Sequence, residues 1–116
     1  MLSNFEKAYK AYLDDEIDKG NIITYTQQKA INLIVYNASQ EPLHFKDYKI
    51  DLVVDTGDAI DWVEVKGFQT NDWLNKWQLA HHLFHDYIDK SKNANLVLVT
   101  GKAENMHSKI VKSYYC

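Results

Sequence analysis

Two acidic residues and a lysine are spaced so that a β-hairpin would bring them onto one face. Asp51 lies in one short apolar run, and Glu64 and Lys66 lie in the next. A turn centred on Gly57 and Asp58 places Asp51 directly opposite Glu64. Directly opposed residues of a hairpin share a face, and Lys66, two residues beyond Glu64, points the same way. The spacing therefore predicts two carboxylates and an ammonium group side by side.

Such a cluster could bind a divalent cation and hydrolyse a phosphodiester. Two opposed carboxylates repel each other unless a cation lies between them, and Mg²⁺ suits an open site of few carboxylates completed by waters. Asp51 and Glu64 would be its ligands, the carbonyl of Val65 could be a further one, and Mn²⁺ is expected to substitute. Lys66 could position or deprotonate a metal-bound water, or neutralise charge on the phosphate under attack. The alternative is a solvated cross-strand cluster with no catalytic role.

The apolar and turn-forming residues predict the elements that would position this cluster. We expect a helix, a long bent strand or tight strand pair, a polar loop, the hairpin, a second helix, a short strand and a closing helix. Their expected ranges are Ser3–Lys19, Ile22–Tyr36, Asn37–Asp47, Tyr48–Val54 with Ile60–Lys66, a helix capped by Thr70, Asn71 or Asp72 and running to about Lys90, Asn95–Thr100 and Glu104–Tyr114.

Two apolar surfaces are expected to hold the cluster in place. The face of the hairpin opposite the cluster would bury Ile50, Leu52, Val54, Val63 and Val65. The helix after the hairpin would bury a stripe of Trp73, Trp77, Ala80, Phe84 and Tyr87. Trp62 would lie on the same face as the cluster, where it could wall the site or stack on a base.

The composition predicts one globular domain spanning residues 1–116. Of the 116 residues, 46% are hydrophobic and 25% are charged. The single cysteine, Cys116, cannot form an internal disulfide, and we find neither a secretory signal nor a run of ~20 apolar residues. These features predict a cytoplasmic protein without a membrane anchor, in the host cytoplasm if a phage encodes it.

The charges are distributed unevenly along the chain. Seven acids lie in residues 47–72 against Lys49 and Lys66, whereas residues 90–116 contain five lysines and one acid, Glu104. This pattern suits a cation site beside a phosphate-contacting surface, although acidic turns and a solvated helix would produce it too. All thirteen basic residues are lysine, which lacks the planar fork that recognises guanine. We therefore expect contacts with the DNA backbone rather than with base sequence.

The segment that carries the cluster resembles the PD-(D/E)XK nuclease superfamily. The run IDLVV supplies Asp51 as the motif aspartate, and VEVKGF supplies Glu64-Val65-Lys66 as the E-x-K motif. Ile50 stands where the proline that names the motif would be. The resemblance covers residues 3–90, and it is nearest to small phage-encoded endonucleases of the Holliday-junction-resolvase type.

The resemblance implies a fold and an activity. The implied fold is α/β (α+β), with a restriction-endonuclease-like αβββαβ core whose mixed central sheet is flanked by helices. The implied activity is Mg²⁺-dependent hydrolysis of DNA phosphodiesters. Because a minimal domain has no separate recognition module, branched DNA or DNA ends are expected substrates. Cleavage of a junction requires two symmetric cuts, so a homodimer is expected as well.

The resemblance also implies further site residues. Members of the superfamily often add a glutamate from the first helix, which could be Glu6 here. A lysine or glutamine often comes from the helix after the E-x-K motif, and Lys76 and Gln78 are the candidates. Lys49, Lys76 and Trp62 are expected to contact the nucleic acid.

Other functions remain compatible with the sequence. The chain could be a catalytically inactive nuclease-fold module that binds nucleic acid or another protein, or a metal-free interaction protein. His81 and His85, one helical turn apart, could chelate a transition metal, but the nearby sequence offers no third ligand.

Overall fold

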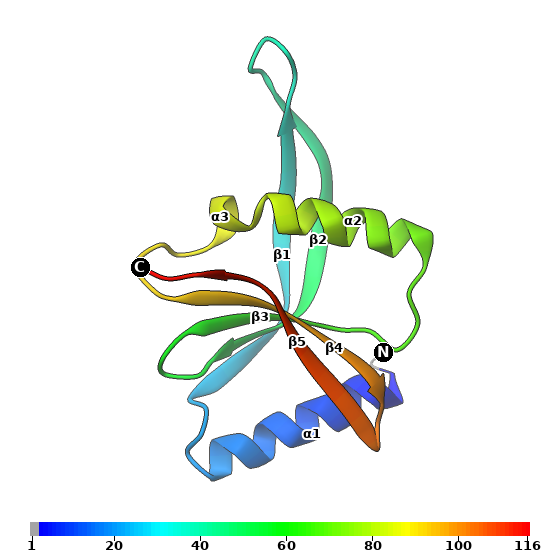
Figure 1. Ribbon diagram of the computed structural model, residues 1–116, viewed down its shortest axis with the longest axis vertical. Helices are drawn as coiled ribbons and strands as arrows, with labels where there is room; N and C mark the ends of the chain where they lie inside the picture. Colours follow the sequence, from blue (N-terminus) through cyan, green and yellow to red (C-terminus); the bar gives the residue numbers. More distant parts are fainter. Residues whose placement is uncertain (1–2) are drawn as a thin grey trace.

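The computed structural model describes residues 3–116, apart from the side chains of residues 35 and 43–46. It has an α+β fold, with an N-terminal helix, a five-stranded mixed sheet and two helices between the third and fourth strands (Figure 1). The elements are α1 (Asn4–Asp18), β1 (Thr24–Tyr36), β2 (Pro42–Asp55), β3 (Ile60–Val65), α2 (Asn71–His82), α3 (Phe84–Tyr87), β4 (Ala94–Lys102) and β5 (Asn105–Tyr114).

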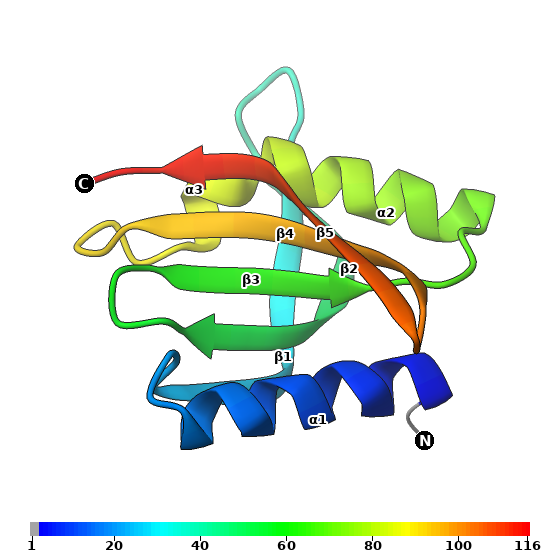
Figure 2. The ribbon, with the colours of Figure 1, turned by 60° about the horizontal axis from the view of Figure 1, so that its bottom comes forward.

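The sheet follows the order of the chain, β1-β2-β3-β4-β5. β3 and β4 are parallel, and every other neighbouring pair is antiparallel. Parallel neighbours need a crossover connection, which α2 and α3 supply. Figure 2 shows α1 along one side of the sheet and α2 on the other, and the β1–β2 hairpin extends beyond α2 (Figures 1 and 2).

The predicted register of the central hairpin is confirmed. Leu52 pairs with Val63 and Val53 with Trp62. The turn is closed by a hydrogen bond from Thr56 N to the Ala59 carbonyl at 3.0 Å. Gly57 has a φ of +89°, which few other residues adopt readily. The register therefore places Asp51 and Glu64 at neighbouring positions on the two strands.

The core lies in two layers, one on each side of the sheet. On the α1 side, Tyr9 and Leu13 pack against residues of β2, β3 and β4. On the α2 side, the helix packs over residues of all four strands from β1 to β4. The α1 layer consists of Tyr9, Leu13, Leu52, Val54, Val63, Val65, Val97 and Val99. The α2 layer includes Ile31, Leu33, Tyr48, Ile50, Trp62, Trp73, Trp77, Phe84 and Leu96.

One predicted core surface is therefore wrong in part. Ile50 does not share a layer with Leu52, although the two are separated by a single residue. The pairing of β1 with β2 is interrupted at this point, where Gln28 has a left-handed φ of 51°. No residue is inserted in either strand, because Gln27 pairs with Leu52 and Lys29 with Ile50 in one register, so the left-handed backbone of Gln28 marks a bend rather than a bulge. The hairpin therefore turns between these residues, and Tyr48 and Ile50 face α2 while Leu52 and Val54 face α1.

The predicted polar loop at 37–47 is too long. β2 begins at Pro42, and the connection between β1 and β2 is the short segment 37–41. Asn37 organises this turn, because its side-chain oxygen accepts hydrogen bonds from the backbone of Ser39 and Glu41. Proline is tolerated at the first position of a strand, where its missing N–H costs no pairing.

The predicted closing helix at 104–114 is wrong. This segment is β5, which pairs with the outer edge of β4 through a tight turn at 103–104. Gly101 has a φ of +108°, and a Cβ there would collide with the carbonyl of Asn105. Strand pairing satisfies the backbone groups that β4 would otherwise leave exposed at its edge. That tertiary requirement outweighs the local preference of the segment.

The predicted helix ending near Lys90 is shorter and broken. α2 ends at His82, and the single turn of α3 follows after Leu83. His81 and His85 therefore do not lie on one continuous helix.

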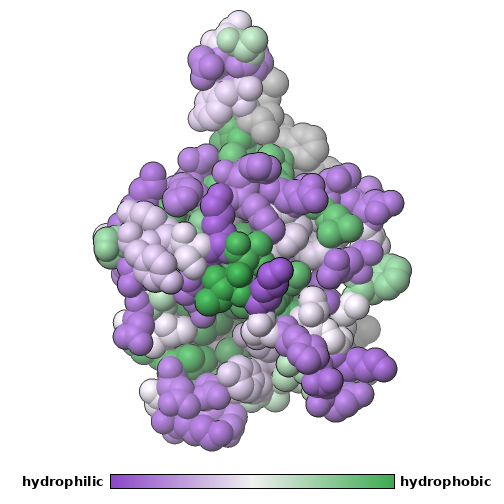
Figure 3. Space-filling view, in the orientation of Figure 1, coloured by the Kyte–Doolittle hydropathy of each residue, from purple (hydrophilic) through white to green (hydrophobic). Residues whose placement is uncertain are grey.

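No helix in residues 3–116 has the length and apolar character that crossing a membrane requires. Hydrophilic side chains cover most of the face seen in Figure 3, with a small apolar patch near its centre.

Candidate active site

A pocket of about 300 Å³ lies where the N-terminal end of α2 meets β2 and β3. The predicted triad of Asp51, Glu64 and Lys66 lines it. The complete lining is Asp47, Tyr48, Lys49, Asp51, Glu64, Lys66, Thr70, Asp72, Trp73 and Lys76. Thr70 starts α2 by accepting a hydrogen bond from Trp73 N at 3.2 Å, and this cap places the first turn of the helix over the pocket.

Glu64 is the most unusual residue of this pocket. It is 3% exposed and is the only charged side chain buried to this degree in the described part of the chain. Its Oε2 accepts hydrogen bonds from the Tyr48 hydroxyl and, at 2.7 Å, from the Trp73 indole N–H. Its Oε1 is equally buried but has no hydrogen-bond partner among the described residues. A buried carboxylate oxygen without a partner is costly unless a cation satisfies it.

Asp51 lies beside Glu64, and its own orientation is fixed by β3. Its Oδ2 accepts a hydrogen bond from Val65 N at 2.8 Å. Burial, then the hydrogen-bonding contact with Glu64 and its negative charge, raises the pKa of Asp51 to about 8, against smaller opposite effects of Val65 N–H and Lys66. Two carboxylates this close hold either a proton or a cation between them.

The donor set fits a hard divalent cation that keeps part of its water shell. Among the side chains that the structure describes, no three His, Cys, Asp or Glu residues converge as the ligands of a closed zinc-type site would. Two carboxylates suffice for Mg²⁺, which retains several waters. Because the N–H of Val65 faces Asp51, and the N–H and C=O of a strand residue point to the same side, the Val65 carbonyl also lies on this side of β3.

Lys66 lies at the edge of the same pocket. Its backbone N–H donates to the Val99 carbonyl at 2.8 Å, which fixes the end of β3 to β4. Its Nζ lies 5.4 Å from the centroid of the Trp73 ring, within the range of a cation–π contact. The ammonium group therefore lies near the Trp73 ring, and its positive charge partly offsets the rise in the pKa of Asp51.

Glu6 approaches the pair of carboxylates from α1. A narrow hollow is lined jointly by Glu6, Gln28, Asp51 and Val65. Burial raises the pKa of Glu6, and the negative charge of Asp51 raises it further. Glu6 does not line the main pocket itself, but it lies close enough to Asp51 for the two charges to interact.

The remaining predicted residues divide into two groups. Lys49 and Lys76 line the pocket, and their contact with nucleic acid stays a prediction. Gln78 is exposed and does not line it. Trp62 is only 5% exposed, because Tyr87 packs edge-on against it with ring centroids 5.2 Å apart. Trp62 therefore belongs to the core, and the expectation that it walls this pocket is wrong.

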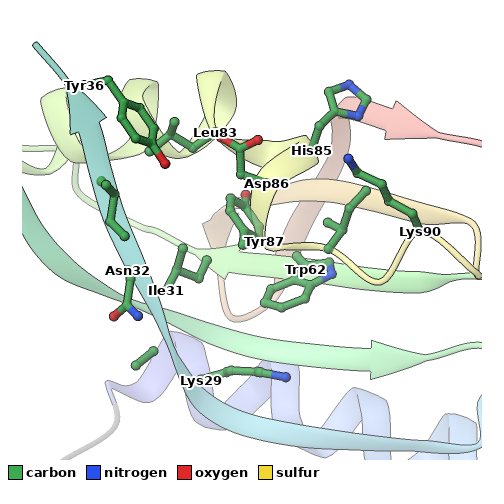
Figure 4. Close-up of a pocket in the computed structure, with 13 residues that line it drawn as sticks. Lys29, Ile31, Asn32, Tyr36, Trp62, Leu83, His85, Asp86, Tyr87 and Lys90 are labelled. Carbon is green, nitrogen blue, oxygen red and sulfur yellow. The ribbon is translucent and has the colours of Figure 1, made fainter. Parts of the chain in front are cut away.

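A larger hollow of about 620 Å³ lies between β1, Trp62 of β3 and the segment that contains α3 (Figure 4). Trp62 lines this hollow, with Lys29 and Lys90 nearby and Nζ of Lys29 5.3 Å from the Trp62 ring centroid. Neither Asp51 nor Glu64 borders it. The smaller pocket, with its converging titratable groups, is therefore the stronger candidate for a site of chemistry.

Two contacts of the candidate site are not predictable from the sequence. Tyr48 precedes Asp51 by three positions, and strict alternation along a strand would point the two to opposite faces. The turn of the hairpin beyond Ile50 brings the Tyr48 hydroxyl to Glu64 instead. Trp73 belongs to the buried stripe of its helix, as the sequence predicts, and its indole N–H also donates to Glu64. No spacing rule indicates either contact.

The histidines of α2 and α3 do not form a metal site with one another. His81 packs edge-on against Trp77, with ring centroids 4.8 Å apart, and burial lowers its pKa. His85 packs against Phe84 and Tyr114 on the other side of the helix break.

No protein-family model matches this chain, and neither a curated protein nor a solved structure matches it. Function must therefore be inferred from the chemistry of the pocket, because a fold alone does not define an activity.

Proposed function

We propose that this protein is a Mg²⁺-dependent deoxyribonuclease of the PD-(D/E)XK type, with a restriction-endonuclease-like fold. The observation that carries the proposal is the pair formed by Asp51 and Glu64. Asp51 has a raised pKa, and Glu64 has a buried oxygen that accepts no hydrogen bond from any described side chain or backbone group. A shared divalent cation would satisfy both conditions at once.

Each residue of the pocket has a role in this proposal. Asp51, Glu64 and the Val65 carbonyl would hold the cation, which would lower the pKa of a bound water and stabilise charge on the phosphate. Lys66 would orient the attacking water and neutralise the developing negative charge. Glu6 is close enough to interact with the same water network from the α1 side.

The substrate is inferred from the lysine side chains around the pocket. Lys49 and Lys76 lie on opposite walls, one on β2 and the other on α2. Lysines bind phosphate groups without reading bases, so the enzyme would recognise the DNA backbone and its shape. Branched DNA or DNA ends are therefore the proposed substrates, and a homodimer would cut both strands of a junction.

A cleavage assay tests this function. The protein is incubated with plasmid, linear duplex, single-stranded DNA and a four-way junction, with Mg²⁺ or with EDTA. We expect Mg²⁺-dependent cleavage of at least one of these substrates, absent from Glu64→Gln. DNA binding without cleavage in Mg²⁺ or Mn²⁺ would instead indicate an inactive nuclease-fold module. Cleavage that persists in Glu64→Gln would place the activity elsewhere.

A further inference from the structure

The two carboxylate oxygens of Glu64 differ in their hydrogen bonds. Oε2 receives both Tyr48 hydroxyl and Trp73 indole N–H, and these two donors also contact each other at 3.0 Å. Oε1 receives no donor from the described residues. All three side chains are buried, so water does not compete for these bonds.

The chemistry of the three groups fixes the direction of these bonds. An ionised carboxylate can only accept, and the indole N–H of Trp73 can only donate. The Tyr48 hydroxyl in contact with Oε2 is therefore the donor of that bond, and Oε2 is occupied by two donors.

The two carboxylate oxygens of Asp51 also differ in their hydrogen bonds. Its Oδ2 is engaged by the backbone N–H of Val65. Each carboxylate of the pair can therefore give a cation one oxygen while the protein holds the other.

We infer that Tyr48 and Trp73 are positioning residues that restrict Glu64 to one-oxygen binding and so make the site prefer Mg²⁺ to Ca²⁺. Ca²⁺ takes six to eight oxygens and readily uses both oxygens of a carboxylate, whereas Mg²⁺ takes six in near-octahedral geometry and suits single-oxygen ligands. Loss of either donor would free one lone pair of Oε2, so that Glu64 could offer both oxygens to a cation. The inference rests on the proposed function only in that the site binds a divalent cation.

Calorimetric titration of the intact protein with MgCl₂ and separately with CaCl₂ tests this inference. The variants are Tyr48→Phe and Trp73→Phe, which remove one donor each. Tyr87→Phe is the matched control for the first, because its hydroxyl is held by the Ala80 carbonyl, remote from the pocket. Trp77→Phe is the control for the second, because Trp77 stacks on Trp73 and has no bond to Glu64.

We expect the Mg²⁺ affinity of Tyr48→Phe and Trp73→Phe to fall by about 10-fold, the usual effect of losing a group that orients a metal ligand. The Ca²⁺ affinity should fall less or rise, so the preference moves toward Ca²⁺, while both controls keep the parent ratio. If one donor variant does not fold, the other decides the outcome. An unchanged ratio in a folded donor variant overturns the inference but leaves the nuclease proposal intact. Absence of Mg²⁺ binding by the parent overturns both.

Discussion

The Asp51 side chain accepts a hydrogen bond from the backbone N–H of Val65, with 2.8 Å between Oδ2 and N. Backbone pairing of β2 with β3 ends at Leu52 and Val63, so a side chain takes over the next donor of β3. The aspartate is thereby oriented by the strand that carries Glu64. Position and charge of Asp51 can be separated by substitution, because asparagine keeps an acceptor oxygen and alanine does not.

The first prediction compares two substitutions of Asp51, one of which keeps the acceptor oxygen and one of which removes it. Asp51→Asn should remain folded and lose both Mg²⁺ binding and cleavage, the latter by at least ~100-fold. Asp51→Ala should also lose stability, by about 1–3 kcal/mol, because Val65 N–H is left without its acceptor. Urea denaturation measures the difference. Equal stability of the two variants would show that the hydrogen bond contributes nothing to folding.

The second prediction concerns Lys66. Lys66→Ala should reduce cleavage by at least ~100-fold, within the range that a positioned acid–base or electrostatic group supplies. Its Mg²⁺ affinity should stay close to that of the parent, because Lys66 is not a ligand. Single-turnover kinetics measures the cleavage rate, and calorimetry measures the Mg²⁺ affinity. Cleavage near the parent rate would remove Lys66 from the mechanism.

The third prediction concerns pH in the absence of metal. The pKa of Asp51 is raised from 3.8 to about 8, so the folded protein binds this proton more tightly than the unfolded chain does. The stabilisation is complete below pH ~4 and is lost as pH rises toward 8. In EDTA, the Tm of the parent should therefore fall over this range relative to Asp51→Asn.

Addition of Mg²⁺ at pH 8.5 should restore the Tm of the parent but not that of Asp51→Asn, since binding to the folded state stabilises it. The difference between the two proteins separates Asp51 from groups whose pKa it does not influence, such as His81. Parallel Tm curves for the two proteins would contradict the account of the carboxylate pair.

The fourth prediction compares two residues of α2. Lys76 lines the pocket, whereas Gln78 is exposed outside it. Lys76→Ala should weaken binding to a labelled four-way junction and reduce the salt dependence by about one phosphate contact. Gln78→Ala should bind like the parent. Fluorescence anisotropy in EDTA measures binding without cleavage, and the reverse order of effects would place the DNA elsewhere.

The fifth prediction concerns Trp62, which the structure assigns to the core. Trp62→Ala should cost about 3–5 kcal/mol of unfolding free energy, the usual cost of truncating a buried tryptophan. Ile23→Ala, at a residue 61% exposed, should change stability by less than ~0.5 kcal/mol. A stable Trp62→Ala protein with weakened DNA binding would return Trp62 to the list of contact residues.

The hairpin and its three chemical residues could be predicted because their signals are local. A Gly-Asp turn between two apolar runs fixes the register, and the register brings Asp51 to Glu64. The cap of α2 at Thr70 was also predictable from residue type. These features depend on neighbours in the sequence.

The features that were missed depend on distant parts of the chain. Segment 105–114 forms β5 by pairing with the edge of β4. The local sequence pattern does not indicate this pairing. The hydrogen bond from Tyr48 to Glu64 forms in a strand whose residues change layers, with Tyr48 and Ile50 on the α2 side and Leu52 and Val54 on the α1 side. Alternation along a straight strand would have pointed Tyr48 away from the site.

The most direct test of the shared cation is a crystal soaked in MnCl₂ at pH 8.5, measured for anomalous scattering from manganese. We predict one strong peak in contact with Glu64 Oε1 and with one oxygen of Asp51, and its loss in crystals of Asp51→Asn. A map without a peak between these carboxylates, from crystals in which manganese binds elsewhere or nowhere, would contradict the proposed active site.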